Sequence, residues 1–132
     1  MKKKFGALIC LLFTFFSCEN KAPEVYTSIV GSWRCEEFNP LLGSRVYLVE
    51  IDRKRGDTTQ YLISNFYNLD INEFIFTRLI AKNLSIVQQQ ILAQTVKSGS
   101  GTVSDNFKRI DFNYNMYDGK NDIQVTAVYT RP

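Results

Sequence analysis

Apolar and polar residues alternate most regularly near the end of the chain. From Ile110 to Met116 every second residue is aliphatic or aromatic and the residues between are polar, which indicates a strand with one buried and one wet face. Asp118-Gly119 follows, and the alternation resumes over residues 123–130. An Asp-Gly pair between two alternating runs predicts an antiparallel hairpin.

Upstream, short runs rich in β-branched and aromatic residues are separated by Gly, Asn and Asp. One such run places Tyr47, Val49 and Ile51 on one face, and Arg55-Gly56-Asp57 is a predicted turn after it. Extended runs are predicted at residues 31–38, 45–53, 59–66, 72–81 and 102–104. With the closing hairpin, the pattern predicts an all-β domain of about seven or eight strands.

Residues 84–96 fit two structures. Leu84, Val87 and Ile91 lie at helical spacing, and the glutamines between them favour a helix. Leu84 and Ile86 also alternate after an Asn turn, and Ser-Gly-Ser-Gly at 98–101 is typical of a hairpin or bulge. We favour strand, with helix left as the alternative.

The N-terminus carries an export signal. Three lysines at 2–4 precede an apolar run at residues 5–16 and then Ser17-Cys18. The run is shorter than the roughly 20 apolar residues that span a bilayer. Residues 15–18 resemble a bacterial lipobox, which implies cleavage before Cys18 and acylation of its sulfur. The alternative is an ordinary secretory signal with Cys18 near the cut by coincidence.

This N-terminus predicts three segments: a signal peptide at 1–17, the acylated Cys18 with a short tether at 18–27, and one domain at 28–132. We expect a lipid anchor in the bacterial cell envelope, at the outer membrane, with the face left open. Three of the sixteen basic residues leave with the signal, so thirteen basic residues remain against thirteen acidic ones. A neutral domain argues against nucleic-acid binding.

The chain offers little catalytic chemistry. It contains no histidine, which removes the commonest general base and metal ligand. Glu36 and Glu37 point to opposite faces if their segment is extended, and Asp118 and Asp122 flank a turn. We therefore expect no enzyme activity, catalytic residue, metal or cofactor. Cys35 has no internal disulfide partner, and we expect a small buried hydrophobe.

Gly31-Ser32-Trp33 resembles the Gly-x-Trp start of lipocalin-like, calycin-type barrels. The layout of residues 28–132 is similar to that of small lipocalin-like lipoproteins of Bacteroidetes, with an Asn-Phe-Tyr run at 65–67, a Gly-Ser-Gly turn at 99–101 and a closing Asp-Gly hairpin. The resemblance implies a small antiparallel β-barrel in which Trp33 plugs one end and stacks on Arg131.

The aromatic residues of the predicted strands allow two functions. Those expected to face the barrel interior as ligand-binding residues are Tyr47, Tyr61, Phe76, Phe112, Tyr114 and Tyr129, with Phe74 beside them. They either hold a small apolar molecule or a glycan, or fill the barrel completely. In the second case the outer face docks a protein partner in the envelope. We predict a binding module, with the docking protein as the alternative.

Overall fold

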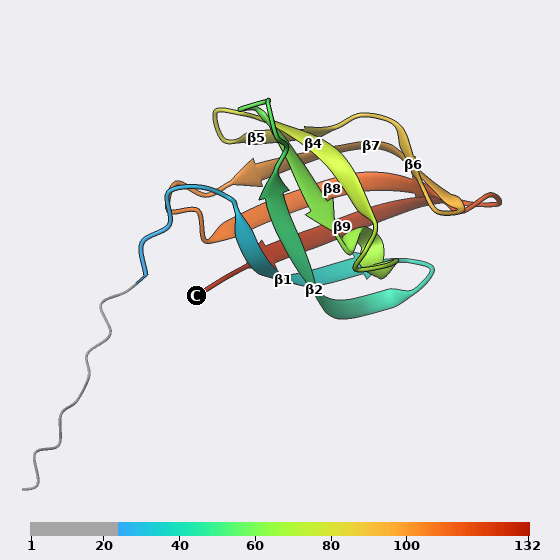
Figure 1. The fold of residues 1–132 in the computed structure, drawn as a ribbon. Helices are drawn as coiled ribbons and strands as arrows, with labels where there is room; N and C mark the ends of the chain where they lie inside the picture. Colours follow the sequence, from blue (N-terminus) through green and yellow to red (C-terminus); the bar gives the residue numbers. More distant parts are fainter. Residues whose placement is uncertain (1–23) are drawn as a thin grey trace, which may run out of the picture.

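The computed structural model describes residues 24–132, so the predicted signal peptide and Cys18 lie outside the described residues. Nine antiparallel strands of this part form one sheet that curls into a barrel (Figure 1). They are β1 (Gly31–Asn39), β2 (Gly43–Arg53), β3 (Gln60–Ser64), β4 (Phe74–Ile80), β5 (Asn83–Ile86), β6 (Gln89–Ile91), β7 (Gln94–Val103), β8 (Arg109–Tyr117) and β9 (Asp122–Thr130). A single 3₁₀ turn, η1 (Phe66–Asn68), is the helical element of these residues. The all-β prediction is confirmed.

The strand order is β5-β4-β3-β2-β1-β9-β8-β7-β6, and β5 also pairs with β7. That last pairing closes a ring of eight strands, while β6 extends along β7 outside the ring. Segment 84–96 is therefore extended, as favoured from its sequence, and the helix alternative is wrong. No helix among residues 24–132 is both long and apolar enough to cross a bilayer.

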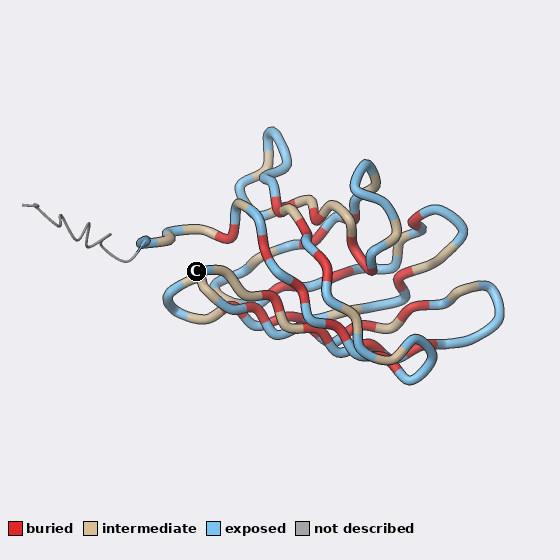
Figure 2. Tube along the Cα trace, turned by 90° about the horizontal axis from the view of Figure 1, so that it is seen from below, coloured by how far each residue is buried: buried red, intermediate tan, exposed pale blue. Residues whose placement is uncertain are grey.

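Burial alternates along most strands, so that buried and exposed residues follow one another along the tube in Figure 2. On β1, for example, Trp33, Cys35 and Glu37 are buried, while Arg34 and Glu36 are exposed. Large side chains fill the inside: Trp33, Tyr114, Tyr129, Phe66 and Phe112 are all essentially inaccessible to solvent. Burial of aromatic and aliphatic surface is the main favourable contribution to the stability of this barrel.

The expected Gly-Ser-Gly turn at 99–101 is wrong, because both glycines lie inside β7. Gly99 lies directly opposite Tyr114 and Gly101 opposite Phe112 on β8. A Cβ on Gly99 would lie 2.8 Å from the Cβ of Tyr114, and one on Gly101 would lie 2.7 Å from the Phe112 ring. The glycines make room for the two rings. A register shift between Val96 and Ser98 marks a bulge just before them.

Gly99→Ala should lower the free energy of unfolding by about 1–3 kcal/mol, because the added methyl group overpacks a filled interior. Urea unfolding followed by circular dichroism measures the change. Ser100→Ala is the matched control, since Ser100 is exposed on the same strand, and it should shift stability by less than about 0.5 kcal/mol. Equal stability of the two variants would show that β7 has room beside Tyr114.

The predicted inward orientation of Phe74 and Phe76 is wrong. Ile75 and Thr77 are buried instead, while Phe74 and Phe76 are 45% and 40% exposed. Three consecutive apolar residues satisfy both phases of a period-two pattern, so the alternation alone does not determine the face. Thr77 tolerates its interior position because its Oγ1 donates a hydrogen bond to the Ser85 carbonyl oxygen at 2.9 Å.

The strand predicted over 59–66 ends earlier, at Ser64. Asn65, Tyr67 and Asn68 adopt positive φ angles of 58°, 57° and 55°, a left-handed conformation that ends a strand. The chain therefore folds over one end of the barrel as η1, and Phe66 and Tyr67 are buried there.

Candidate functional site

One end of the barrel is closed by Trp33 and Arg131. The Arg131 guanidinium carbon lies 4.1 Å from the centroid of the Trp33 ring, as the resemblance to lipocalin-like barrels implied. Trp33 Nε1 donates to the Ile29 carbonyl oxygen at 2.9 Å. Arg131 donates to the carbonyl oxygens of Val30 at 2.9 Å and Phe107 at 2.7 Å. The first described residues and the C-terminus meet at this end (Figure 1).

Nearer the other end, a buried polar network surrounds Glu37, whose side chain is fully inaccessible. Glu37 Oε1 accepts hydrogen bonds from the hydroxyls of Tyr47 at 2.6 Å and Tyr114 at 2.7 Å. Its Oε2 accepts from Arg45, with Nε at 2.8 Å. Arg45 Nη2 also donates to the Tyr67 carbonyl oxygen at 3.0 Å, which ties η1 to the barrel wall.

This network is built to be static. Burial raises the pKa values of the Tyr47 and Tyr114 phenols far above their ordinary value, so both remain protonated hydrogen-bond donors. Glu37 has partners on both oxygens, and the charge of Arg45 compensates its own. The hydroxyls of Tyr67 and Tyr129 are buried without a partner. We assign the network a structural role, which is to join β1, β2, β8 and η1.

The residues predicted to bind a ligand do not all lie on the same side of the barrel wall. Five of them, Tyr47, Tyr61, Phe112, Tyr114 and Tyr129, are buried in the barrel, whereas Phe76 lies outside it. Ring centroids of Phe112 and Tyr129 are 4.8 Å apart, and those of Phe66 and Tyr114 are 4.6 Å apart. Five hollows formed by residues 24–132 open at the surface. The interior rings pack on one another.

Cys35 is buried opposite Tyr47 and Tyr129. Burial raises the pKa of its thiol to about 12, so the reactive thiolate is almost absent at neutral pH. We predict that a thiol reagent does not label Cys35 in the native domain at pH 8 and labels it fully in urea. Prompt native labelling would contradict this burial.

The same pKa shift has a consequence for stability at alkaline pH. Between the ordinary value of 9.0 and about 12 the unfolded chain has released a proton that the folded thiol keeps. The thiol's contribution to stability is complete below pH 9 and is lost as the pH rises through this window.

The acidic residues that the sequence analysis considered for catalysis do not converge. Glu36 is exposed and paired with Arg34, and Asp122 pairs with Lys97 at 3.0 Å. Asp118 accepts backbone hydrogen bonds within its own turn, which lowers the pKa of its carboxyl. In the part of the chain that the structure describes, no three acidic, Cys or His residues cluster as a metal site would require.

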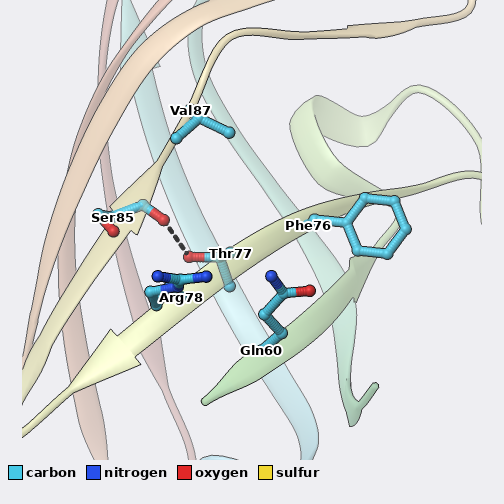
Figure 3. A pocket seen from close by; sticks show the side chains of 6 residues that line it. All are labelled: Gln60, Phe76, Thr77, Arg78, Ser85 and Val87. Carbon is cyan, nitrogen blue, oxygen red and sulfur yellow. Dashed lines mark hydrogen bonds between the residues drawn. The ribbon is translucent and has the colours of Figure 1, made fainter. Parts of the chain in front are cut away.

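An apolar and basic hollow of about 290 Å³ lies on the outside, where β4 and β5 separate. Figure 3 shows its lining: Gln60, Phe76, Thr77, Arg78, Ser85 and Val87. Pairing of β4 with β5 covers only Arg78 to Ile80, and the chain then leaves β4 to form β6 along β7. The hydrogen bond from Thr77 to the Ser85 carbonyl oxygen joins β4 and β5 at the point where the two strands begin to separate.

The exposed face of this hollow combines aromatic rings with positive charge. Phe74 and Phe76 pack edge to face with centroids 5.4 Å apart. Lys54 Nζ lies 5.2 Å from the centroid of Phe76, and Arg78 is exposed beside it. The nearby Asp57 carboxylate accepts both hydrogen bonds of Thr59, which lowers the pKa of Asp57. The two cations, Lys54 and Arg78, outnumber this one carboxylate, so the hollow favours an apolar ligand that carries a negative charge.

Sequence reasoning missed both this hollow and Glu37. The hollow depends on where β5 leaves β4, which no local pattern encodes. The alternation of the first strand could have predicted the burial of Glu37. This glutamate is in phase with Trp33 and Cys35, so its side chain points into the barrel, and a buried carboxylate needs hydrogen-bond donors.

Comparison with known proteins bears on the architecture. No family model and no curated protein matches the chain. A solved structure described as a redesigned β-barrel is similar, with a TM-score of 0.50 and 11% identity, covering 79% of this chain and 91% of that one. The fold is a closed antiparallel β-barrel. At 11% identity the likeness extends to the fold alone.

Proposed function

We propose that the protein is a lipid-anchored lipoprotein of the bacterial cell envelope whose solid barrel docks a protein partner through its outer surface. The observation that carries the docking role is the filled interior. Five of the six residues predicted to bind a ligand are buried against other side chains, while the hollow with exposed rings and cations lies outside. Binding inside the barrel, the first prediction from the sequence, requires these rings to move apart.

The anchor rests on the sequence of residues 2–18. Two or more acyl chains on Cys18 attach a protein stably, because each buried methylene contributes about 0.8 kcal/mol. Labelling of cells with a clickable fatty acid, followed by mass analysis of the mature N-terminus, tests this. We expect an acylated N-terminal Cys18 and loss of the label in Cys18→Ser. An unmodified N-terminus at another residue would overturn the anchor.

Docking is tested separately. Cells are treated with a short membrane-permeant crosslinker, and the mature protein is purified in detergent. The proposal expects one defined envelope protein in constant stoichiometry, retained with an exposed control change, Lys120→Glu. Repeated recovery of a lone monomer counts against docking and leaves the anchor unaffected.

A second candidate function is glycan binding on the outer face of β7, β8 and β9. There Ser98, Asn115 and Gln124 form one cross-strand row, and Ser100, Asn113 and Thr126 form the next. Five of these six neutral residues, all except Thr126, border a shallow hollow of about 380 Å³. The buried carboxamide oxygen of Asn115 has no hydrogen-bond partner. Hydroxyl and amide groups without charge suit neutral sugars. NMR titration of the protein with a panel of neutral oligosaccharides tests this candidate function. Unchanged signals for these residues would exclude glycan binding at this face.

A further inference from the structure

The outer edge of β4 lacks a neighbouring strand over half its length. On one side β4 pairs with β3 from Phe74 to Arg78. On the other side, the pairing with β5 begins only at Arg78. Neither β5 nor β6 is paired with residues 74–77 in the described structure. This part of β4 is an edge inside an otherwise closed ring, and an open strand edge is a template for another strand.

The side chain of Gln89 occupies the vacant strand position. Its Oε1 accepts a hydrogen bond from Phe76 N at 2.7 Å, and its Nε2 donates to Phe76 O at 2.8 Å. A carboxamide offers one acceptor and one donor side by side, as a backbone residue in an antiparallel pair does. Gln89 thus satisfies the backbone of Phe76 as a strand would. Because strand alternation has a period of two, the backbone of Phe74 faces the same side.

The surroundings define what else an occupant must carry. Phe76 and Val87 lie on opposite sides of the hollow and are 40% and 71% exposed. An apolar side chain of a bound segment would therefore bury additional apolar surface between them. Lys54 and Arg78 stand beside Phe76, so a neighbouring carboxylate finds two cations.

We propose that a short extended segment of a partner protein, bearing an apolar residue next to an acidic one, adds to β4 at Phe74 and Phe76 in place of the Gln89 carboxamide. This proposal rests on the docking role proposed above and specifies its mode, which is strand addition. The main-chain hydrogen bonds supply attachment, the hollow receives the apolar side chain, and Arg78 and Lys54 select the acidic one. A free apolar molecule would leave the backbone of Phe76 with its present partner, which is why we favour a peptide.

The direct test uses detergent-solubilised mature protein and a synthetic heptapeptide, acetylated and amidated, of alternating valine and threonine with one threonine replaced by glutamate. Isothermal titration calorimetry measures affinity, and hydrogen exchange locates the site. We expect slower exchange of the amides of Phe74 and Phe76, which face the open edge. Two versions N-methylated on alternate residues, one for each edge of the peptide, separate strand addition from adsorption. One version should bind at least about tenfold more weakly and the other should bind normally.

Two variants supply readouts that a purely structural role would not change. Gln89→Ala removes the internal competitor and should tighten binding by about threefold to tenfold. Arg78→Glu should weaken binding of the glutamate peptide and strengthen binding of the matching lysine peptide, whereas Lys120→Glu, a charge change in the β8–β9 turn, should change neither. Thermal unfolding of each variant shows that the barrel is intact.

Each contrary result overturns the proposal. These are no binding at millimolar peptide, equal binding of both N-methylated versions, weaker binding by Gln89→Ala, or protection of a surface other than residues 74–78. Concentration-dependent dimers abolished by the peptide would assign the edge to a second copy of this chain. None of these results bears on the acylation of Cys18. A failure of the proposed strand addition at β4 can therefore be distinguished from a failure of the proposed lipid anchor.

Discussion

Glu37→Ala is expected to lower the free energy of unfolding by about 3–5 kcal/mol, the typical cost of removing one partner of a buried ion pair. The substitution leaves the Tyr47 and Tyr114 hydroxyls without their acceptor and Arg45 without its carboxylate. It also frees η1 indirectly, because Arg45 holds the Tyr67 carbonyl oxygen. Urea unfolding followed by the fluorescence of Trp33 measures the loss.

Glu36→Ala provides the matched control. The two glutamates are neighbours on β1, but the Glu36 side chain is 56% exposed, so its removal should change stability by less than about 0.5 kcal/mol. If both variants lost the same small amount, Glu37 would not be the centre of a buried network.

Trp33→Ala should cost about 3–5 kcal/mol, the usual range for truncating a fully buried aromatic side chain. Trp33 is 1% exposed, and the indole also supports Arg131, which bonds to the backbone on either side of the barrel end. Thermal unfolding by circular dichroism measures the effect, since Trp33 is the chain's single tryptophan.

Two further variants divide this cost. Arg131→Met retains an aliphatic stem but loses the cation-π contact, about 0.5–2 kcal/mol, together with the hydrogen bonds to Val30 and Phe107. Phe38→Ala is the control for aromatic truncation, because Phe38 is 56% exposed. A loss in Trp33→Ala no greater than that in Phe38→Ala would show that the Trp33 end does not hold the barrel closed.

The strands that could be predicted are those whose two faces differ. On β8 and β9 every second residue is apolar, and the hairpin between them carries an Asp-Gly turn, so the pattern predicted both the strands and their pairing. Phe74-Ile75-Phe76 is apolar throughout, and the tertiary structure placed the smaller Ile75 inside. Gly99 and Gly101 are typical turn residues in the local sequence, yet they lie inside a strand, where the absence of a side chain leaves space for Tyr114 and Phe112 on the facing strand.

The contacts of the candidate site could not be predicted from the sequence for a different reason. Glu37 and Tyr114 are 77 residues apart, and Gln89 and Phe76 are 13 apart on strands that do not pair. Such contacts follow from strand order and register, which alternation does not encode. The sequence does place a glutamate in phase with the buried residues of β1 and a glutamine after a short strand. The partners of these two side chains can be identified only when the order of the strands in the barrel is known.

Native mass spectrometry of the protein purified from its own cells tests the central claim most directly, because that claim is a barrel filled by its own side chains and used from the outside. We predict the mass of the acylated chain starting at Cys18, alone or with a polypeptide partner, and no small molecule bound in stoichiometric amount. A small cargo that stays with the folded chain and is released only when it unfolds would contradict the account.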